Sequence, residues 1–137
     1  MKNLLRKAAT LAAATGIAAA GLMATAAPAS AAAYNGACGS GYGVVNKIEF
    51  HDNRGTIFLT YNNSTGYNCV VTVRTNPGAA APMEAFLRVS GTSTWKKDSG
   101  NYTTYAGPVY VAAASRCVDW GGTIGTITLD ESRTNCG

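Results

Sequence analysis

Two short runs decide the fold: Thr56-Ile57-Phe58-Leu59-Thr60-Tyr61 and Tyr67-Asn68-Cys69-Val70-Val71-Thr72-Val73-Arg74. Ile57, Leu59 and Tyr61 share one face of the first run. In the second run, one face carries Tyr67, Cys69, Val71 and Val73, and the opposite face carries Asn68, Thr72 and Arg74. A period of two residues is typical of β-strands. The joining stretch 62–66 is rich in turn residues and ends in glycine, so the sequence predicts a β-hairpin here.

Similar short runs of β-branched and aromatic residues lie on both sides of this hairpin. We expect extended segments at 44–50, 83–90, 95–98, 101–105, 108–114, 116–120 and 123–129. Pro77-Gly78 and Pro82 predict a loop over Thr75–Pro82, because proline interrupts a hydrogen-bonded ladder. Helix signals are nearly absent. The pattern predicts an all-β fold, a small antiparallel sandwich or barrel of about seven to nine strands.

The segment 83–90 has a clear inward face. We expect Met83, Ala85, Leu87 and Val89 to point to the core, because they alternate with Glu84, Arg88 and Ser90. Phe86, on the polar side, is the exception to this alternation.

The first 33 residues predict an export signal. Basic residues at positions 2, 6 and 7 precede a run of small apolar residues that ends at Pro28. Ala29-Ser30-Ala31 and Ala31-Ala32-Ala33 then offer the small-x-small pattern of signal-peptidase sites. We expect residues 1–33 to be cleaved, residues 34–137 to form one secreted domain, and the mature protein to have no membrane anchor.

Removal of this segment changes the charge of the protein. The whole chain has 11 basic and 7 acidic side chains, and three of the basic ones lie within the first seven residues. The mature domain therefore keeps eight basic and seven acidic side chains, a net charge of +1. Apart from Lys96-Lys97 its basic residues are dispersed, whereas a nucleic-acid-binding protein usually concentrates them. We expect no nucleic-acid partner.

All four cysteines, Cys38, Cys69, Cys117 and Cys136, lie in the mature domain. An even number of cysteines outside the cytoplasm predicts disulfides. Their wide spacing lacks the close pairs of a zinc site, so we expect no metal and no cofactor. Among the three possible connectivities we predict the sequential one, Cys38–Cys69 and Cys117–Cys136, because it links segments that the strand pattern already places close together.

Several segments of the mature chain resemble the spore-associated protein A family of spore-forming actinobacteria. The resemblance spans the mature chain and includes all four cysteines. It implies a secreted protein found with aerial hyphae or spores, and it implies no reaction or catalytic residue. The matching segments are Tyr34-Asn35-Gly36-Ala37-Cys38-Gly39-Ser40-Gly41-Tyr42, Asn68-Cys69-Val70-Val71-Thr72-Val73-Arg74, Tyr102-Thr103-Thr104-Tyr105-Ala106-Gly107-Pro108-Val109, Cys117-Val118-Asp119-Trp120 and Asn135-Cys136-Gly137.

Candidate catalytic groups are few. His51, the only histidine, lies in Glu49-Phe50-His51-Asp52, where it would be the acid/base residue of a small hydrolase with Glu49 or Asp52 as its partner. The same residues fit an ordinary turn edge. Asp119, beside Trp120, is either a carboxylate with a perturbed pKa or one that caps a turn or pairs with Arg116. We prefer the structural interpretation of both residues and predict no catalytic site.

Tyrosines are the remaining functional signal. Tyr102, Tyr105 and Tyr110 lie within nine residues, around the Gly107-Pro108 break, which we expect to leave part of this segment unpaired and accessible. Tyrosine is favoured at binding surfaces, although it also covers cores. We therefore name Tyr102, Tyr105 and Tyr110 as the candidate binding surface.

These observations favour a secreted, non-enzymatic protein of the spore or hyphal surface that binds an envelope component. Two alternatives stay open. One is an inhibitor of an extracellular protease or glycosidase that acts through the Thr75–Pro82 loop, and the other is a small hydrolase built around His51. An exposed aromatic patch would favour adhesion, a protruding cross-linked loop would favour the inhibitor, and a deep pocket at His51 or Asp119 would favour the enzyme.

Overall fold

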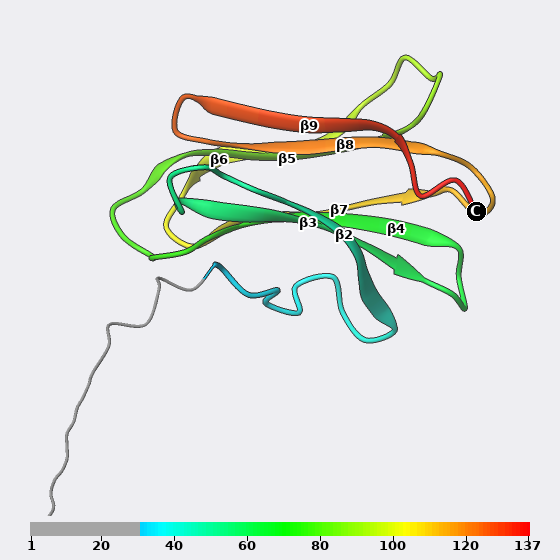
Figure 1. Cartoon of the computed structure of the whole chain (residues 1–137), viewed down its shortest axis with the longest axis horizontal. Helices are drawn as coiled ribbons and strands as arrows, with labels where there is room; N and C mark the ends of the chain where they lie inside the picture. The colour runs from blue at the N-terminus through cyan, green and yellow to red at the C-terminus, as the bar shows by residue number, and fades with distance from the viewer. Residues whose placement is uncertain (1–30) are drawn as a thin grey trace, which may run out of the picture.

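The structure is a computed structural model that describes residues 31–137. It has eight strands in two four-stranded antiparallel sheets, packed face to face (Figure 1). The predicted all-β fold is therefore confirmed in its sandwich form. The predicted signal segment falls almost wholly outside the described residues, and its cleavage stays a prediction. No helix in the described part of the chain is long and apolar enough to cross a membrane.

One sheet has the strand order β2-β3-β4-β7, and the other has the order β6-β5-β8-β9. The chain crosses between the sheets after β4, after β6 and after β7. The strands are β2 (Tyr42–Glu49), β3 (Gly55–Asn62), β4 (Tyr67–Arg74), β5 (Ala81–Val89), β6 (Lys96–Tyr102), β7 (Tyr105–Ala112), β8 (Val118–Ile124) and β9 (Ile127–Thr134).

The predicted hairpin is β3 and β4, paired in unbroken register from Gly55 opposite Arg74 to Asn62 opposite Tyr67. Both faces of this hairpin are buried. One face contributes Ile57, Leu59 and Val70 to the core between the sheets. The other face carries a second cluster, Phe58, Val71 and Val73, on the outside of the sheet, where the N-terminal segment packs against it. The face of β4 that carries Cys69, Val71 and Val73 is thus on the outside of the sandwich.

The core lies between the sheets and is built around Trp120, which is fully buried. The predicted inward face of β5 is confirmed: Met83, Ala85 and Leu87 are buried in this core, and Val89 packs against it. Phe86 does face outward, yet it is only 8% exposed. Its ring meets the Trp95 ring edge to face at 5.2 Å, which explains how an apolar side chain is covered on the polar side of the strand.

Several of the predicted boundaries are wrong, among them the end of the Thr75–Pro82 loop, because β5 begins at Ala81 and Pro82 pairs with Asn101. The segment 123–129 is not one strand, because Gly125, with φ of +67°, turns the chain between β8 and β9. The segment 101–105 is also divided, between β6 and β7, by a bend at Thr103-Thr104. The segment 116–120 becomes a strand only at Val118. These turns are short and lie within runs of β-branched residues. The residue composition therefore changes too little at each turn to mark where one strand ends and the next begins.

The expected break at Gly107-Pro108 is a bulge inside β7. Val70 pairs with Val109 and Thr72 pairs with Ala106, so Gly107-Pro108 opposes a single residue of β4. The extra residue reverses the alternation of β7 from this point onward. Thus Tyr105 and Tyr110, five residues apart, both lie on the outer face of the sheet, opposite Val73 and Cys69.

Candidate functional site

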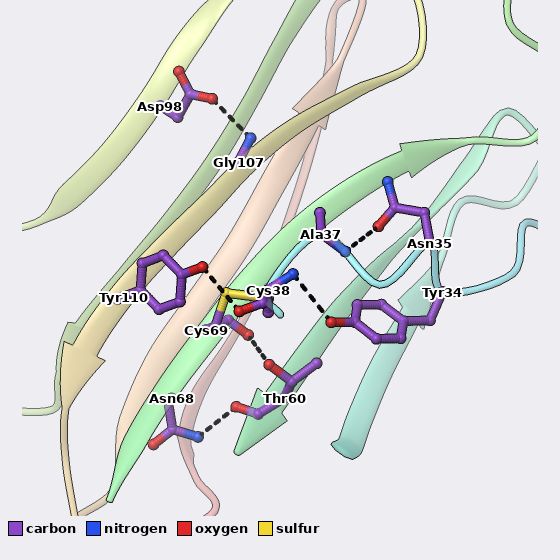
Figure 2. The surroundings of a disulfide bond; sticks show 10 residues. All are labelled: Tyr34, Asn35, Ala37, Cys38, Thr60, Asn68, Cys69, Asp98, Gly107 and Tyr110. Atoms are coloured by element: carbon purple, nitrogen blue, oxygen red, sulfur yellow. Dashed lines mark hydrogen bonds between the residues drawn. A yellow bond between two sulfur atoms is a disulfide. The ribbon is translucent and has the colours of Figure 1, made fainter. Parts of the chain in front are cut away.

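The outer face of the β2-β3-β4-β7 sheet is covered by the N-terminal segment 31–41, which we call the strap. A disulfide joins Cys38 of the strap to Cys69 of β4, and both cysteines are buried (Figure 2). The Tyr34 ring packs edge to face on Phe58, with ring centroids 5.7 Å apart. The Tyr34 hydroxyl accepts a hydrogen bond from the Cys38 backbone N–H at 3.2 Å. The strap is therefore part of the fold, because it buries the second apolar cluster.

Tyr110, on β7, also contacts the strap. Its hydroxyl donates to the Cys38 carbonyl oxygen at 2.9 Å (Figure 2). The pKa of Tyr110 is raised above its ordinary value. Burial is the main cause, and the neighbouring Tyr42 and Tyr34 phenols make smaller contributions. Tyr110 nevertheless remains 38% exposed. This side chain therefore has both a structural contact and a free ring surface.

Three tyrosines are exposed on this outer face. Tyr67 is 41% exposed, and Tyr105 and Tyr110 are each 38% exposed. Tyr67 begins β4 two residues before Cys69, so it shares the outer face with the other two. We call these three residues the tyrosine face. Tyr67 is not one of the predicted binding residues, although its alternation with Cys69 places both residues on one face of β4.

Tyr102 does not belong to the tyrosine face. It lies on β6, in the other sheet, and packs against the main core. Its hydroxyl donates to Asp98 Oδ1, and this hydrogen bond, more than burial, raises the pKa of Tyr102. The second oxygen of Asp98 accepts from the Gly107 backbone N–H at 2.8 Å (Figure 2). Asp98 therefore links the two sheets, and Tyr102 supports that link.

His51 lies exposed in the turn between β2 and β3. Its expected partners are engaged elsewhere: Glu49 pairs with Lys47 at 2.8 Å, and Asp52 pairs with Arg54. The Arg54 hydrogen bonds lower the pKa of Asp52. No hydrogen bond or ion pair between His51 and another described side chain is found, so this turn assembles no acid/base pair.

Asp119 is buried and surrounded by donors. Arg88 Nε donates to Oδ2 at 2.9 Å, while Ser90 Oγ and the Arg133 backbone N–H donate to Oδ1 at 2.6 and 3.0 Å. Burial alone would raise the pKa of Asp119, but the hydrogen bonds from Ser90, Arg133 and Arg88 outweigh it and hold the pKa below its usual value. The suggested pairing with Arg116 is wrong, because the partner is Arg88. With its oxygens so engaged, Asp119 is an ionised structural group.

The loop between β4 and β5 is exposed over residues 76–80. Arg74 Nη1 holds it by donating to the Ala79 carbonyl at 2.8 Å, and the Gly78 N–H donates to the Thr103 carbonyl at 3.2 Å. Neither disulfide has a cysteine in this loop, since the bridges join Cys38 to Cys69 and Cys117 to Cys136. Both bridges agree with the predicted connectivity.

Within residues 31–137, no group of three or more histidine, cysteine, aspartate or glutamate side chains could hold a metal ion. The main cavities in this part of the chain are lined neither by His51 nor by Asp119. The tyrosine face therefore stands as the candidate interaction site.

Comparison with known proteins places this arrangement in a family. No family model matches the chain, and no solved structure matches it. Over 105 residues the chain is 47% identical to Spore-associated protein A of Streptomyces coelicolor, a match that covers 77% of this chain and 68% of that relative. At this identity and coverage the chain belongs to the spore-associated protein A family.

Proposed function

We propose that this protein is a secreted, non-enzymatic protein that associates with the surface of spores or hyphae through its tyrosine face. The observation that carries the proposal is the 47% identity to a protein named for its association with spores. Two disulfides fit a location outside the cytoplasm, where such bonds persist. The partner is an envelope component of the spore or hypha.

The tyrosine face supports adhesion by ring contacts. Tyr67, Tyr105 and Tyr110 present exposed rings on one side of one sheet. Fully burying an aromatic side chain contributes roughly 1.5–3 kcal/mol, so covering the exposed parts of three rings adds a favourable term to binding. Tyrosine also presents this area at a low cost in conformational entropy, because its ring is rigid.

Charge contributes little to this proposal. Ion pairs use Lys47, Arg54, Arg88 and Lys97, each with an acidic neighbour on the protein itself. The net charge of residues 34–137 is only +1, from eight basic and seven acidic side chains. Attraction to an anionic wall would therefore be weak and would disappear in salt.

The proposal is tested by washing bound protein from spores in rising salt. We expect the wild type to stay bound at about 0.5 M salt, where the Debye length is only a few Å. Tyr105→Ala and Tyr67→Ala should each reduce the bound fraction, and the double variant should reduce it further. Tyr110→Ala is avoided because it also removes the hydrogen bond to the strap.

Two matched controls make the result specific. Ile127→Ala removes a side chain of similar exposure, 41%, from the other sheet and should leave binding unchanged. Lys96→Ala/Lys97→Ala removes the one adjacent basic pair of residues 34–137. Release of the wild type by salt, together with loss of binding in the lysine variant alone, would contradict adhesion through tyrosines. Turnover of RNA or a polysaccharide by the purified protein, abolished in His51→Ala, would contradict the non-enzymatic role.

A further inference from the structure

One cavity of about 320 Å³ lies at an end of the sandwich. Three separate parts of the chain meet there: the end of β3 with its turn, the turn between β7 and β8, and the last residues of the described chain. Its lining comprises Tyr61, Asn63, Ala113, Ser115, Asn135 and Gly137. Loops at the end of a β-sandwich are a common location for binding sites.

The rim of this cavity is held in place by several constraints. The Cys117–Cys136 disulfide joins the two segments that contribute Ser115 and Asn135. The Ala113 N–H donates to the Gly66 carbonyl at 3.0 Å, which ties the β7 end to the β3–β4 turn. Binding groups on such a cross-linked rim lose little conformational freedom when a ligand arrives.

Two of the polar lining residues have a rare backbone conformation. Ser115 has φ of 59° and Asn135 has φ of 56°, both in the left-handed region. Only a few per cent of non-glycine residues adopt this region, and such residues cluster at functional sites. Asparagine is enriched in this region, so Ser115 is the more unusual of the two.

The chemistry of the lining is polar but carries no charged side chain. Asn63 and Asn135 each offer an amide oxygen and an amide NH₂, and Ser115 offers a hydroxyl that both donates and accepts. Tyr61 adds an aromatic ring. An anionic ligand would lose hydration here without gaining an opposite charge, which is costly. The lining instead suits a neutral ligand with several hydroxyl groups.

We propose that this cavity binds one ring of an uncharged saccharide. Its volume is at the small end for ligand pockets, which is consistent with one ring rather than a long chain. The inference rests on the proposed function, because it names a neutral envelope polysaccharide as the component that the protein recognises. The tyrosine face then adds contact area outside the cavity.

The test is a titration of purified protein with maltose, cellobiose and chitobiose at millimolar concentrations, followed by NMR. We expect at least one of these sugars to shift the signals of Asn63, Ser115 and Asn135. Asn135→Gly keeps a left-handed backbone accessible while it removes the amide, and it should weaken binding about tenfold or more. Asn53→Gly is the matched control, since Asn53 has φ of 59° in a turn elsewhere and should leave binding unchanged.

Three results would overturn the saccharide site: no shift with any of the three sugars, shifts confined to residues outside the cavity, or equal weakening in Asn135→Gly and Asn53→Gly. Equal binding of glucuronate would also contradict a neutral ligand. The proposed function is judged separately by the spore-binding assay. Spore association without sugar binding overturns only the cavity, and sugar binding without spore association overturns only the surface role.

Discussion

The rings of Tyr42 and Tyr110 meet edge to face with centroids 5.6 Å apart, although β2 and β7 are the two edges of their sheet. The contact spans the outer face across β3 and β4, on the side where Cys38 is joined to Cys69. The Tyr110 hydroxyl also donates a hydrogen bond to the Cys38 carbonyl oxygen. Tyr110 therefore stabilises the strap, whether or not a partner binds its exposed ring.

Tyr110→Phe is expected to lower the free energy of unfolding by about 0.5–1.5 kcal/mol, because it removes the hydrogen bond to Cys38 and keeps the ring. Urea denaturation measures the change. Tyr105→Phe is the control, since no hydrogen bond from the Tyr105 hydroxyl is found among the described residues, and it should change stability less. Equal effects of the two variants would mean that the contact to the strap contributes nothing.

Replacement of either disulfide by serines is expected to be destabilising, by about 4 kcal/mol for Cys38–Cys69 and about 3 kcal/mol for Cys117–Cys136 on the chain-entropy model. The first bridge closes a loop of 31 residues and the second one of 19, which sets the order. Urea denaturation of Cys38→Ser/Cys69→Ser and Cys117→Ser/Cys136→Ser checks it. A Cys38–Cys136 fragment in unreduced peptide maps would contradict the pairing itself.

The sequence predicted the sandwich because its strongest signals were local. Alternation identified the β3–β4 hairpin and the inward face of β5, and the even number of cysteines indicated two bridges. The sequence pattern could not predict which segments cover the two faces of the β3–β4 hairpin. The hairpin is buried on both sides because the strap returns over it, and strand periodicity contains no information about a distant segment.

The candidate surface was predicted only in part, for a similar reason. Simple alternation places Tyr105 and Tyr110 on opposite faces, and only the bulge at Gly107-Pro108 brings them together. Tyr102 was grouped with them by proximity in sequence, but the bend after β6 puts it in the other sheet. Nothing local distinguishes a tyrosine that supports Asp98 from one that is exposed to a partner.

His51→Ala is expected to change stability by less than about 1 kcal/mol, as substitutions at exposed positions usually do. Spore association should be unchanged, because His51 lies in the β2–β3 turn and is not part of the tyrosine face. Thermal unfolding and the salt-wash assay measure the two effects. A loss of binding without a loss of stability would point to a contact role for this turn.

Asp98→Ala is expected to loosen the attachment of β6 to β7. It leaves the part-buried Gly107 N–H without its acceptor, which costs about 1 kcal/mol. It should also lower the pKa of Tyr102 toward the ordinary tyrosine value, because the hydrogen bond to Asp98 is the main cause of the raised pKa. NMR titration of the tyrosine ring carbons follows this pKa. An unchanged Tyr102 titration would show that the hydrogen bond is absent in solution.

Asp119 should make the protein sensitive to acid. Its pKa is lowered in the folded state, since the donors Ser90, Arg133 and Arg88 outweigh the opposing effect of burial. The stabilisation is therefore complete above the unfolded-state pKa, near 3.9, and is lost as the pH falls through the lower folded-state pKa. Urea denaturation between about pH 6 and pH 2 should show stability falling over the acidic part of this range.

Asp119→Asn tests whether this carboxylate is responsible. It keeps the size of the side chain but removes the charge that faces Arg88 and an acceptor needed by Ser90 or Arg133, so it should lower stability at neutral pH. Because the variant has no carboxyl to protonate, its stability should fall less steeply with acid than that of the wild type. Asp52→Asn is the control: that carboxylate is also paired with arginine, but it is exposed, and solvent screens its contribution. If Asp52→Asn flattened the acid profile as much as Asp119→Asn did, the buried position of Asp119 would not be what couples folding to pH.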